Sequence, residues 1–249
     1  MKENGIHISK LSKQYPGNDS FALKEISFDI FDGEIFGLLG PNGAGKTTFL
    51  SILCGLLKPT GGDVSVYSYS LNKDTEAIKK IFGVVPQDFA LYNTLSGRDN
   101  LMYIGRMYGL KGSVLKDRVQ ECLSKFGFDN NSNELVKNYS GGMKRRINLI
   151  GGILHEPKVL LLDEPTVGMD VQTRMAIIEH LQELNRTKRI TIIYTSHNLD
   201  QAELFCKRVG IIDKGQLLCI GSPQDLMKQE NCTDLEEVFL KLTGRKIRD

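Results

Sequence analysis

The stretch GPNGAGKT, residues 40–47, stands between an apolar run at 35–39 and a segment with helical spacing. It fits the pattern G-x-x-x-x-G-K-[ST] placed between a strand and a helix. Glycines in such a loop let backbone N–H groups turn inward around phosphate oxygens, and the helix N-terminus adds partial positive charge. We expect Lys46 to reach the β- and γ-phosphates of a nucleotide and the Thr47 hydroxyl to bind Mg²⁺. The alternative is a glycine-rich turn with a purely structural role.

Two adjacent carboxylates, Asp163 and Glu164, follow the apolar run VLLL at 159–162. Open α/β sheets bind ligands at the carboxyl ends of their strands. Asp163 is therefore expected to hold a metal ion, directly or through water, and Glu164 to orient an attacking water or accept its proton. Taken alone, the pair could equally be the solvated end of a strand. Beside a phosphate-binding loop, it indicates catalysis.

The sequence YSGGMKRR, residues 139–146, predicts a second helix N-terminus able to bind an anion. Ser140 suits the N-cap position, and Gly141 and Gly142 leave backbone N–H groups uncovered. Met143 then begins the inward-facing side of the helix. The alternative is a capped helix start without a ligand, which leaves unexplained why one chain has two such helix starts.

Near-continuous apolar runs predict strands buried on both faces, as in a parallel sheet. These runs occupy residues 81–85, 159–162, 190–195 and 209–212. Helical spacing after Asp170 fits a connection between two of them and indicates an α/β fold with a mostly parallel sheet. Alternation at 26–30, followed by Asp32-Gly33 and residues 34–39, predicts an antiparallel hairpin.

The patterns divide the chain into three regions. Residues 1–220 are expected to form the main domain, and about 94–154, with helical spacing but no convincing strand, an inserted helical subdomain. Residues 221–249 are expected to form a short helical tail, with helix starts at Ser222-Pro223 and near Leu235.

Composition excludes few classes of protein. The 249 residues carry a formal net charge of +2, so bulk charge argues for neither nucleic acid nor an anionic membrane. The five cysteines include no CxxC, which favours a reducing cytosol. No apolar run approaches the roughly 20 residues that span a bilayer. If the protein acts at a membrane, we therefore expect it to do so as a peripheral subunit.

The order of these motifs, with Gln87 before Ser140 and His197 after the run at 190–195, resembles the nucleotide-binding domain of ABC transporters. The resemblance covers nearly the whole chain. It implies a P-loop NTPase core, an N-terminal antiparallel β subdomain and the inserted helical subdomain. It further implies an ATPase with ATP and Mg²⁺ as cofactors, peripheral on the inner face of the cell membrane, and an integral membrane transporter subunit as partner.

The same resemblance assigns the site residues. Those expected to bind ATP are Tyr15, Gly40, Pro41, Asn42, Gly43, Ala44, Gly45, Lys46, Thr47 and Thr48. Those expected to act in catalysis are Glu164, His197 and Gln87, with Thr47, Gln87 and Asp163 at the metal. Those expected at the opposite subunit's ATP, in a homodimer or a heterodimer with a paralogous ATPase, are Ser140, Gly141, Gly142 and Met143.

Individual assignments have plain structural alternatives. Tyr15, expected to stack on adenine, could be an ordinary buried or loop tyrosine. Gln87 could be solvated surface, and His197, expected at the γ-phosphate, could be a structural histidine at a strand end. Asp170, expected in the loop that crosses the dimer interface, could simply be a helix N-cap.

Departures from the commonest family pattern occur at Tyr139, Met143 and Met169, where Leu, Gln and Leu are usual. None of the three removes a phosphate ligand. The YSGGM sequence at 139–143, together with the tail at 235–244, resembles subunits of drug-, polysaccharide- and ion-exporting systems, which predicts export. An importer subunit is the alternative.

Other functional classes fit the sequence less well. A nucleic-acid- or ribosome-directed relative would need a second cassette, a long insertion or a basic face, so we expect no nucleic acid partner. A P-loop kinase would need neither the SGG sequence nor Asp170. A purely structural module would not need Asp163 beside the loop. Finally, Phe89, Leu91 and Tyr92 are predicted to form an apolar dock for the membrane partner, with internal packing as the alternative.

Overall fold

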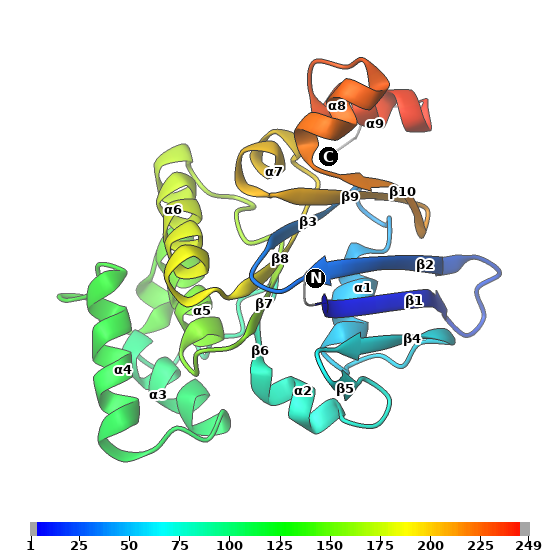
Figure 1. Ribbon diagram of the computed structural model, residues 1–249. Coiled ribbons are helices and arrows are strands. Elements are labelled where there is room, and N and C mark those ends of the chain that lie inside the picture. Colours follow the sequence, from blue (N-terminus) through cyan, green and yellow to red (C-terminus); the bar gives the residue numbers. More distant parts are fainter. Residues whose placement is uncertain (1–3, 245–249) are drawn as a thin grey trace.

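Two sheets organise the computed structural model, which describes residues 4–244 (Figure 1). The first has the order β2-β1-β4-β5 and the second the order β10-β9-β3-β8-β7-β6. Helices of the central and C-terminal parts of the chain flank the second sheet (Figure 1). The expected α/β fold with an N-terminal antiparallel sheet is confirmed.

The first sheet is antiparallel throughout its described pairings. Its strands are β1 (Asn4–Gln14), β2 (Phe21–Phe31), β4 (Gly61–Val66) and β5 (Tyr69–Ser70). Alternate residues of β2, including Ile26, Phe28 and Ile30, are buried. They face α1 (Lys46–Leu53), whose Phe49 ring lies 5.6 Å from that of Phe28.

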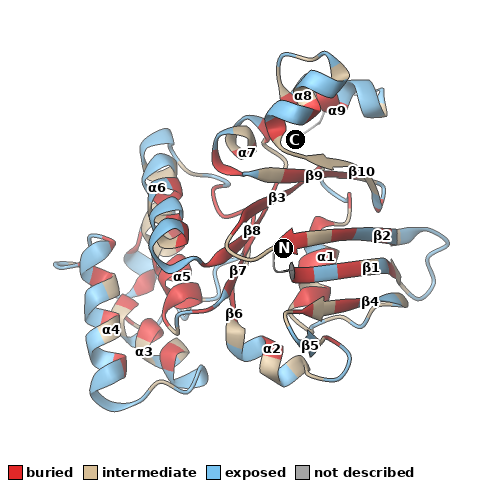
Figure 2. Ribbon diagram, in the orientation of Figure 1, coloured by how far each residue is buried: buried red, intermediate tan, exposed pale blue. Residues whose placement is uncertain are grey.

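The second sheet is parallel except at one edge, where β10 pairs antiparallel with β9. Its strands are β3 (Ile35–Leu39), β6 (Phe82–Val85), β7 (Val159–Asp163), β8 (Thr191–Ser196), β9 (Arg208–Asp213) and β10 (Gln216–Gly221). Every residue of β3, β7 and β8 is buried, because both faces of the sheet are covered (Figure 2). The four strands predicted from apolar runs are all present.

The predicted antiparallel hairpin is wrong. β2 pairs with β1, whereas β3 pairs in parallel with β8 and β9. The turn at Asp32-Gly33, with Gly33 at φ +69°, leads the chain from one sheet into the other. β3 is buried on both faces, which is typical of a parallel sheet, whereas β2 alternates between buried and exposed residues, which is typical of an antiparallel one, so the two strands suit different sheets.

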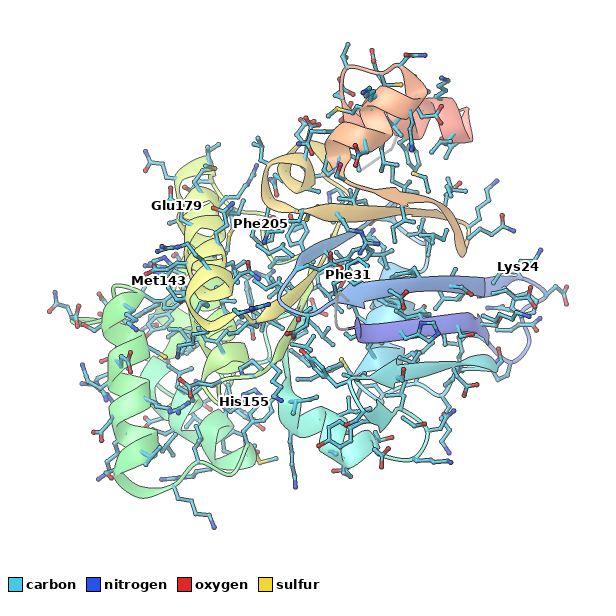
Figure 3. The ribbon with its side chains drawn as sticks, in the orientation of Figure 1. Lys24, Phe31, Met143, His155, Glu179 and Phe205 are labelled. Carbon is cyan, nitrogen blue, oxygen red and sulfur yellow. The ribbon has the colours of Figure 1, made fainter. Side chains whose placement is uncertain are left out.

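Helices cover the face of the second sheet that points away from the first sheet. These are α6 (Val171–Lys188), α7 (Leu199–Phe205) and α9 (Leu235–Thr243), the last preceded by α8 (Pro223–Glu230). Phe205, labelled in Figure 3, packs edge-on against Tyr194 of β8, with ring centroids 5.3 Å apart. The helix pair expected in the tail is therefore present, and α9 packs through Leu235, Val238 and Phe239.

Between β6 and β7, the chain forms helices and no named strand within the described residues. These are α3 (Gly97–Met107), α4 (Gly112–Lys125), the short η1 (Val136–Asn138) and α5 (Gly141–Ile153). They share a core that includes Leu101, Leu115, Val119 and Leu123, and α5 also packs against β6. A small helix, α2 (Thr75–Ile81), precedes β6. Within residues 4–244, no helix combines the length and apolar character needed to cross a membrane.

Candidate functional site

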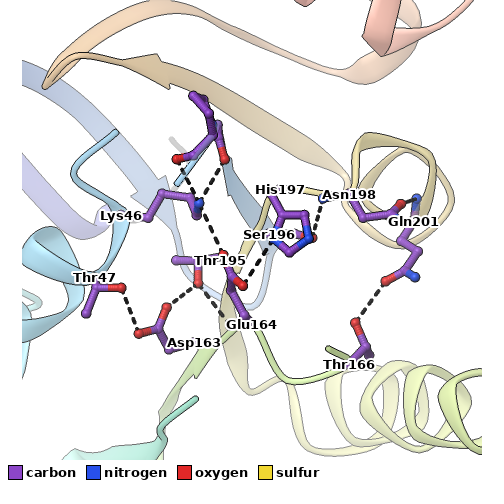
Figure 4. Close-up of polar contacts among 12 residues, drawn as sticks. Lys46, Thr47, Asp163, Glu164, Thr166, Thr195, Ser196, His197, Asn198 and Gln201 are labelled. Atoms are coloured by element: carbon purple, nitrogen blue, oxygen red, sulfur yellow. Dashed lines mark hydrogen bonds and ion pairs between the residues drawn. The ribbon is translucent and has the colours of Figure 1, made fainter. Parts of the chain in front are cut away.

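Three neighbouring parallel strands, β3, β8 and β7, end at the same edge of the second sheet. The GPNGAGKT loop follows β3, Glu164 follows Asp163 at the end of β7, and His197 follows β8. Sheet order thus brings together side chains that are far apart in the sequence (Figure 4).

The loop after β3 is shaped by glycine. Gly45 has φ +112°, and a Cβ there would lie 2.4 Å from the carbonyl oxygen of Ala22. At Gly40, a Cβ would lie 2.1 Å from the carbonyl oxygen of Ile212. No side-chain hydrogen bond caps the start of α1 at Gly45. The backbone N–H groups of its first turn are therefore suited to an anion.

Lys46 is buried at the centre of the site, with 4% of its surface exposed. Its Nζ donates hydrogen bonds to the carbonyl oxygens of Gly40 (2.8 Å) and Pro41 (3.2 Å). It also lies 3.2 Å from Oε1 of Glu164. The ammonium group is thus held over the loop, at the place where a phosphate would meet it.

Asp163 links the loop to the sheet. Its Oδ2 accepts a hydrogen bond from Thr47 Oγ1 (3.0 Å), and its Oδ1 accepts one from Thr195 Oγ1 (2.7 Å). Carboxylate and hydroxyl oxygens are the ligands that Mg²⁺ prefers, so the donor set of Thr47 and Asp163 fits that metal.

Glu164 lies between two basic side chains and is 6% exposed. Opposite the Lys46 contact, its Oε2 lies 3.1 Å from Nδ1 of His197. Its backbone N–H donates to Thr195 Oγ1 (3.1 Å), and its φ of +45° is in the left-handed region, uncommon for this residue type. The carboxylate is therefore held by two basic side chains, and the backbone of the same residue by Thr195.

A cavity of about 560 Å³ lies over these groups. Its lining includes seven of the predicted ATP-binding residues together with two predicted catalytic ones. These are Tyr15, Asn42, Gly43, Gly45, Lys46, Thr47 and Thr48, with Gln87 and Glu164. Tyr15 lies at one end, with its Oη 3.2 Å from Thr48 Oγ1. Gly40, Pro41 and Ala44 belong to the same loop but do not line the cavity.

The second helix start lies apart from this cavity. Ser140 is the N-cap of α5, accepting a hydrogen bond from Met143 N (3.2 Å), and no residue of 140–143 lines the cavity. Ser140 and Gly141 are exposed, and a Cβ added at Gly141 would meet no other atom within 4 Å outside its own helix turn. Met143 (Figure 3) is partly buried against the helical core.

Asp170 is a helix N-cap in this structure. It accepts hydrogen bonds from the backbone N (2.9 Å) and Oγ1 (2.7 Å) of Thr173 at the start of α6. These bonds, the backbone one above all, hold the pKa of the Asp170 carboxyl below its usual value. The structural alternative given above is thus observed, and any role at an interface would come in addition.

Sequence reasoning missed Thr195, which is fully buried and joins Asp163 to the backbone of Glu164. The available signal was a hydroxyl within an otherwise apolar strand, close before His197. Also missed was Gln201 of α7, whose amide lies 2.9 Å from Thr166 Oγ1 and 3.1 Å from Tyr194 Oη. Nothing in the sequence marks Gln201.

Comparisons with known proteins agree with this geometry. The family model described as ABC transporter matches residues 23–167. Linearmycin resistance ATP-binding protein LnrL of Bacillus subtilis is 46% identical over 204 residues, which are 82% of this chain and 65% of LnrL. ABC transporter A family member 10 of Arabidopsis thaliana is 40% identical over 90% of this chain and 25% of its own length. The chain thus spans less than two thirds of either relative.

Solved structures show the same fold. An ATP-binding subunit of an ABC transporter superposes with a TM-score of 0.86 at 28% identity, covering 96% of this chain and 99% of that one. An ATP-binding cassette solved as a dimer in a post-hydrolysis state with ADP and Pi bound gives 0.79 at 27% identity, over 87% of this chain and 98% of that one. From the matched family model and these relatives, the chain belongs to the ABC transporter family and carries the family's ATP-hydrolysing domain.

Proposed function

We propose that this chain binds and hydrolyses ATP to drive export by a separate membrane subunit, acting from the inner face of the cell membrane. The observation that carries the proposal is the position of Glu164. Its carboxylate lines the cavity beside the glycine-rich loop and is held between Lys46 and His197.

In this proposal, each group has one task. Lys46 exchanges its contacts with loop carbonyls and Glu164 for the β- and γ-phosphates of ATP. Glu164, released from Lys46, accepts the proton of the attacking water, and His197 meets the γ-phosphate. Thr195 holds the backbone of Glu164 in place.

Mg²⁺, when bound, would neutralise the phosphate charge that develops during hydrolysis. Thr47 Oγ1 and the Asp163 carboxylate, 3.0 Å apart, would hold it, with Gln87 at the cavity wall. Tyr15, at the end of the same cavity, would stack on the adenine ring.

The second helix start would serve the ATP of another subunit. Residues 140–143 do not line this chain's own cavity, and Ser140 is exposed. A head-to-tail dimer, of two copies or with a paralogue, would place this helix N-terminus against the other subunit's γ-phosphate. The similar cassette solved as a dimer with ADP and Pi bound supports the formation of a dimer.

The membrane partner would dock beside Gln87. Phe89 is 42% exposed and Tyr92 is 52% exposed, whereas Leu91 packs partly against the helical core. The proposed dock therefore consists of the two aromatic residues, without Leu91. Export is favoured by the similarity to LnrL, a resistance protein by name.

Light scattering of the Glu164→Gln variant tests the proposal. Without the catalytic carboxylate, ATP should bind but not turn over, and the variant should form a stable dimer with ATP but not with ADP. Adding Ser140→Arg should preserve ATP binding and abolish the dimer. A Glu164→Gln chain that turns over ATP at the parent rate would contradict the assigned role of Glu164.

A further inference from the structure

The loop that carries Gln87 is fastened to helix α5. The carbonyl oxygen of Pro86 accepts two hydrogen bonds from this helix, one from Arg145 Nη1 (3.0 Å) and one from Asn148 Nδ2 (3.2 Å). Arg145 is 5% exposed and Asn148 is 4% exposed. Both lone pairs of one backbone carbonyl are thus used by buried side chains of a single helix.

A second pair of contacts fastens the other end of the same loop. The backbone N–H of Ala90 donates to Asn148 Oδ1 (3.3 Å), and the Arg145 guanidinium lies 4.8 Å from the ring centre of Phe89. Asn148 therefore uses its amide nitrogen at Pro86 and its amide oxygen at Ala90. Because the contacts bracket residues 86–90, this segment and α5 should move together.

The two ends of this unit lie at two different sites. Gln87 follows Pro86 directly and lines the cavity with Lys46 and Glu164. Helix α5 begins next to Ser140, which is exposed and apart from that cavity. One rigid connection therefore joins the wall of one nucleotide cavity to the helix start proposed for another.

Burying an arginine costs free energy, because its charged group loses contact with water. Desolvation lowers the pKa of the Arg145 guanidinium, partly opposed by the charge of Asp88, and its Nε has no hydrogen-bond partner. Apolar residues of similar volume often stabilise a protein as well as buried ionic groups do, so packing alone does not require an arginine here. A requirement for a directed donor to the Pro86 carbonyl, beside the one from Asn148, does explain it.

We infer that Arg145 and Asn148 are positioning residues that transmit a displacement of Gln87 to the Ser140 end of α5. ATP in one cavity then sets the position of the helix start that completes the other site. This inference rests on the proposed function, because it takes Gln87 to respond to bound nucleotide and Ser140 to meet the partner's ATP.

Arg146 provides a matched control on the same helix. Its Nη1 donates to the carbonyl oxygen of Phe126 (2.8 Å), and its guanidinium lies 4.9 Å from the ring centre of Phe128. These are the same two kinds of contact, but their partners lie in the helical region, away from Gln87. A general need for arginine contacts would make the two positions equivalent.

Hydrogen exchange with and without Mg²⁺ and ATP tests the inference on the intact chain. In the parent, ATP should slow exchange in both 86–92 and 139–146. In Arg145→Met, which keeps the apolar stem, the slowing should remain at 86–92 and fall several-fold at 139–146. Arg145→Lys, which can still donate to Pro86, should recover part of the response. Arg146→Met should behave as the parent.

Each contrary result has a distinct meaning. Equal losses in Arg145→Met and Arg146→Met, or a full response in Arg145→Met, would overturn the inference alone. If Arg145→Met does not fold, Asn148→Leu takes its place and must show the same selective loss at 139–146. A parent chain that does not bind ATP would overturn the proposed function, and the inference with it.

Discussion

Nζ of Lys46 lies 3.2 Å from Oε1 of Glu164, with both side chains almost fully buried. Two groups proposed to act on a nucleotide therefore neutralise each other in this structure. A buried charge that loses its partner is strongly destabilising, by about 3–5 kcal/mol in well-studied pairs. Function and stability should accordingly respond to the same substitutions in different ways.

Replacing Lys46 by alanine should weaken ATP binding in the presence of Mg²⁺ by more than tenfold, since the cation placed over the phosphates is lost. Equilibrium binding measures the effect. Lys79→Ala, which breaks only a surface pair with Glu76, is the control and should bind as the parent does. Affinity of Lys46→Ala within a factor of two of the parent would contradict the assignment.

The same pair predicts non-additive stability. Lys46→Ala leaves the Glu164 carboxylate with His197 as its remaining side-chain partner and should lower the free energy of unfolding by about 3 kcal/mol. Lys46→Ala combined with Glu164→Gln should be more stable than Lys46→Ala alone, because no uncompensated charge remains. Urea denaturation of the parent, the two single variants and the double variant completes this double-mutant cycle. Additive losses of unfolding free energy would show that the two side chains do not interact.

Tyr139 and Gly97 should be coupled through space. A Cβ at Gly97 would lie 2.4 Å from Tyr139 Oη, whose hydroxyl donates to the carbonyl oxygen of Asn131 (2.6 Å). Gly97→Ala should therefore destabilise the protein by about 1–3 kcal/mol through overpacking. Tyr139→Leu in the same chain should recover part of that loss, measured as unfolding midpoints. A double variant no more stable than Gly97→Ala would refute the coupling.

His155 should make stability depend on pH. Burial lowers its pKa below the ordinary 6.5, the charge of Arg118 lowers it further, and the carbonyl of Phe82 raises it. Below pH 6.5, the unfolded chain takes up a proton that the folded chain resists, so stability falls with falling pH until the lowered pKa is reached. His155, labelled in Figure 3, also stacks on Tyr108, with ring centroids 3.6 Å apart.

His155→Phe keeps an aromatic ring beside Tyr108 but cannot titrate. Between pH 7 and pH 5, the parent should lose more free energy of unfolding than this variant does. Denaturant titrations at both pH values give the change in free energy of unfolding for the parent and for the variant. Subtracting one change from the other removes the effects of carboxyl groups, which both proteins share. Equal losses in the two proteins would show that His155 titrates at its ordinary pKa.

Tyr92→Glu should weaken co-purification of the membrane subunit and leave basal ATP hydrolysis unchanged, because the ring is half exposed and packs at a steep angle against Tyr103, whose hydroxyl lies 3.5 Å from its own. Leu56→Glu, at a more exposed leucine after α1, is the control. If both variants retain the membrane subunit, the dock lies elsewhere. Leu91 is a poorer choice, since its partial burial mixes docking with folding.

The sequence predicted the central strands well because each is a continuous apolar run, and a strand buried on both faces has no other pattern. The glycine-rich loop and Asp163 were equally visible, since the loop immediately follows such a strand and Asp163 is the last residue of another. Once the strand order is known, their proximity is a consequence of parallel pairing.

Pairing itself was not predictable from local pattern. Residues 26–30 and 34–39 are joined by a short turn, yet each pairs with strands distant in the sequence. Similarly, the sequence marks Arg145 as one cation among several, and only the packing of α5 against β6 shows that it meets Pro86. Such side-chain contacts depend on the helix orientation, which the residues themselves do not reveal.

The central position of β3 also has a consequence for the newly made chain. Its neighbours in the sheet are β8 and β9, whose residues 191–196 and 208–213 are synthesised long after residues 35–39. At about 5–20 residues per second, the ribosome delivers them on the order of ten seconds later. Until then, the strand that precedes the glycine-rich loop lacks both of its neighbours in the sheet. ATP therefore cannot stabilise early folding intermediates and can stabilise the domain only once nearly all of it has been synthesised.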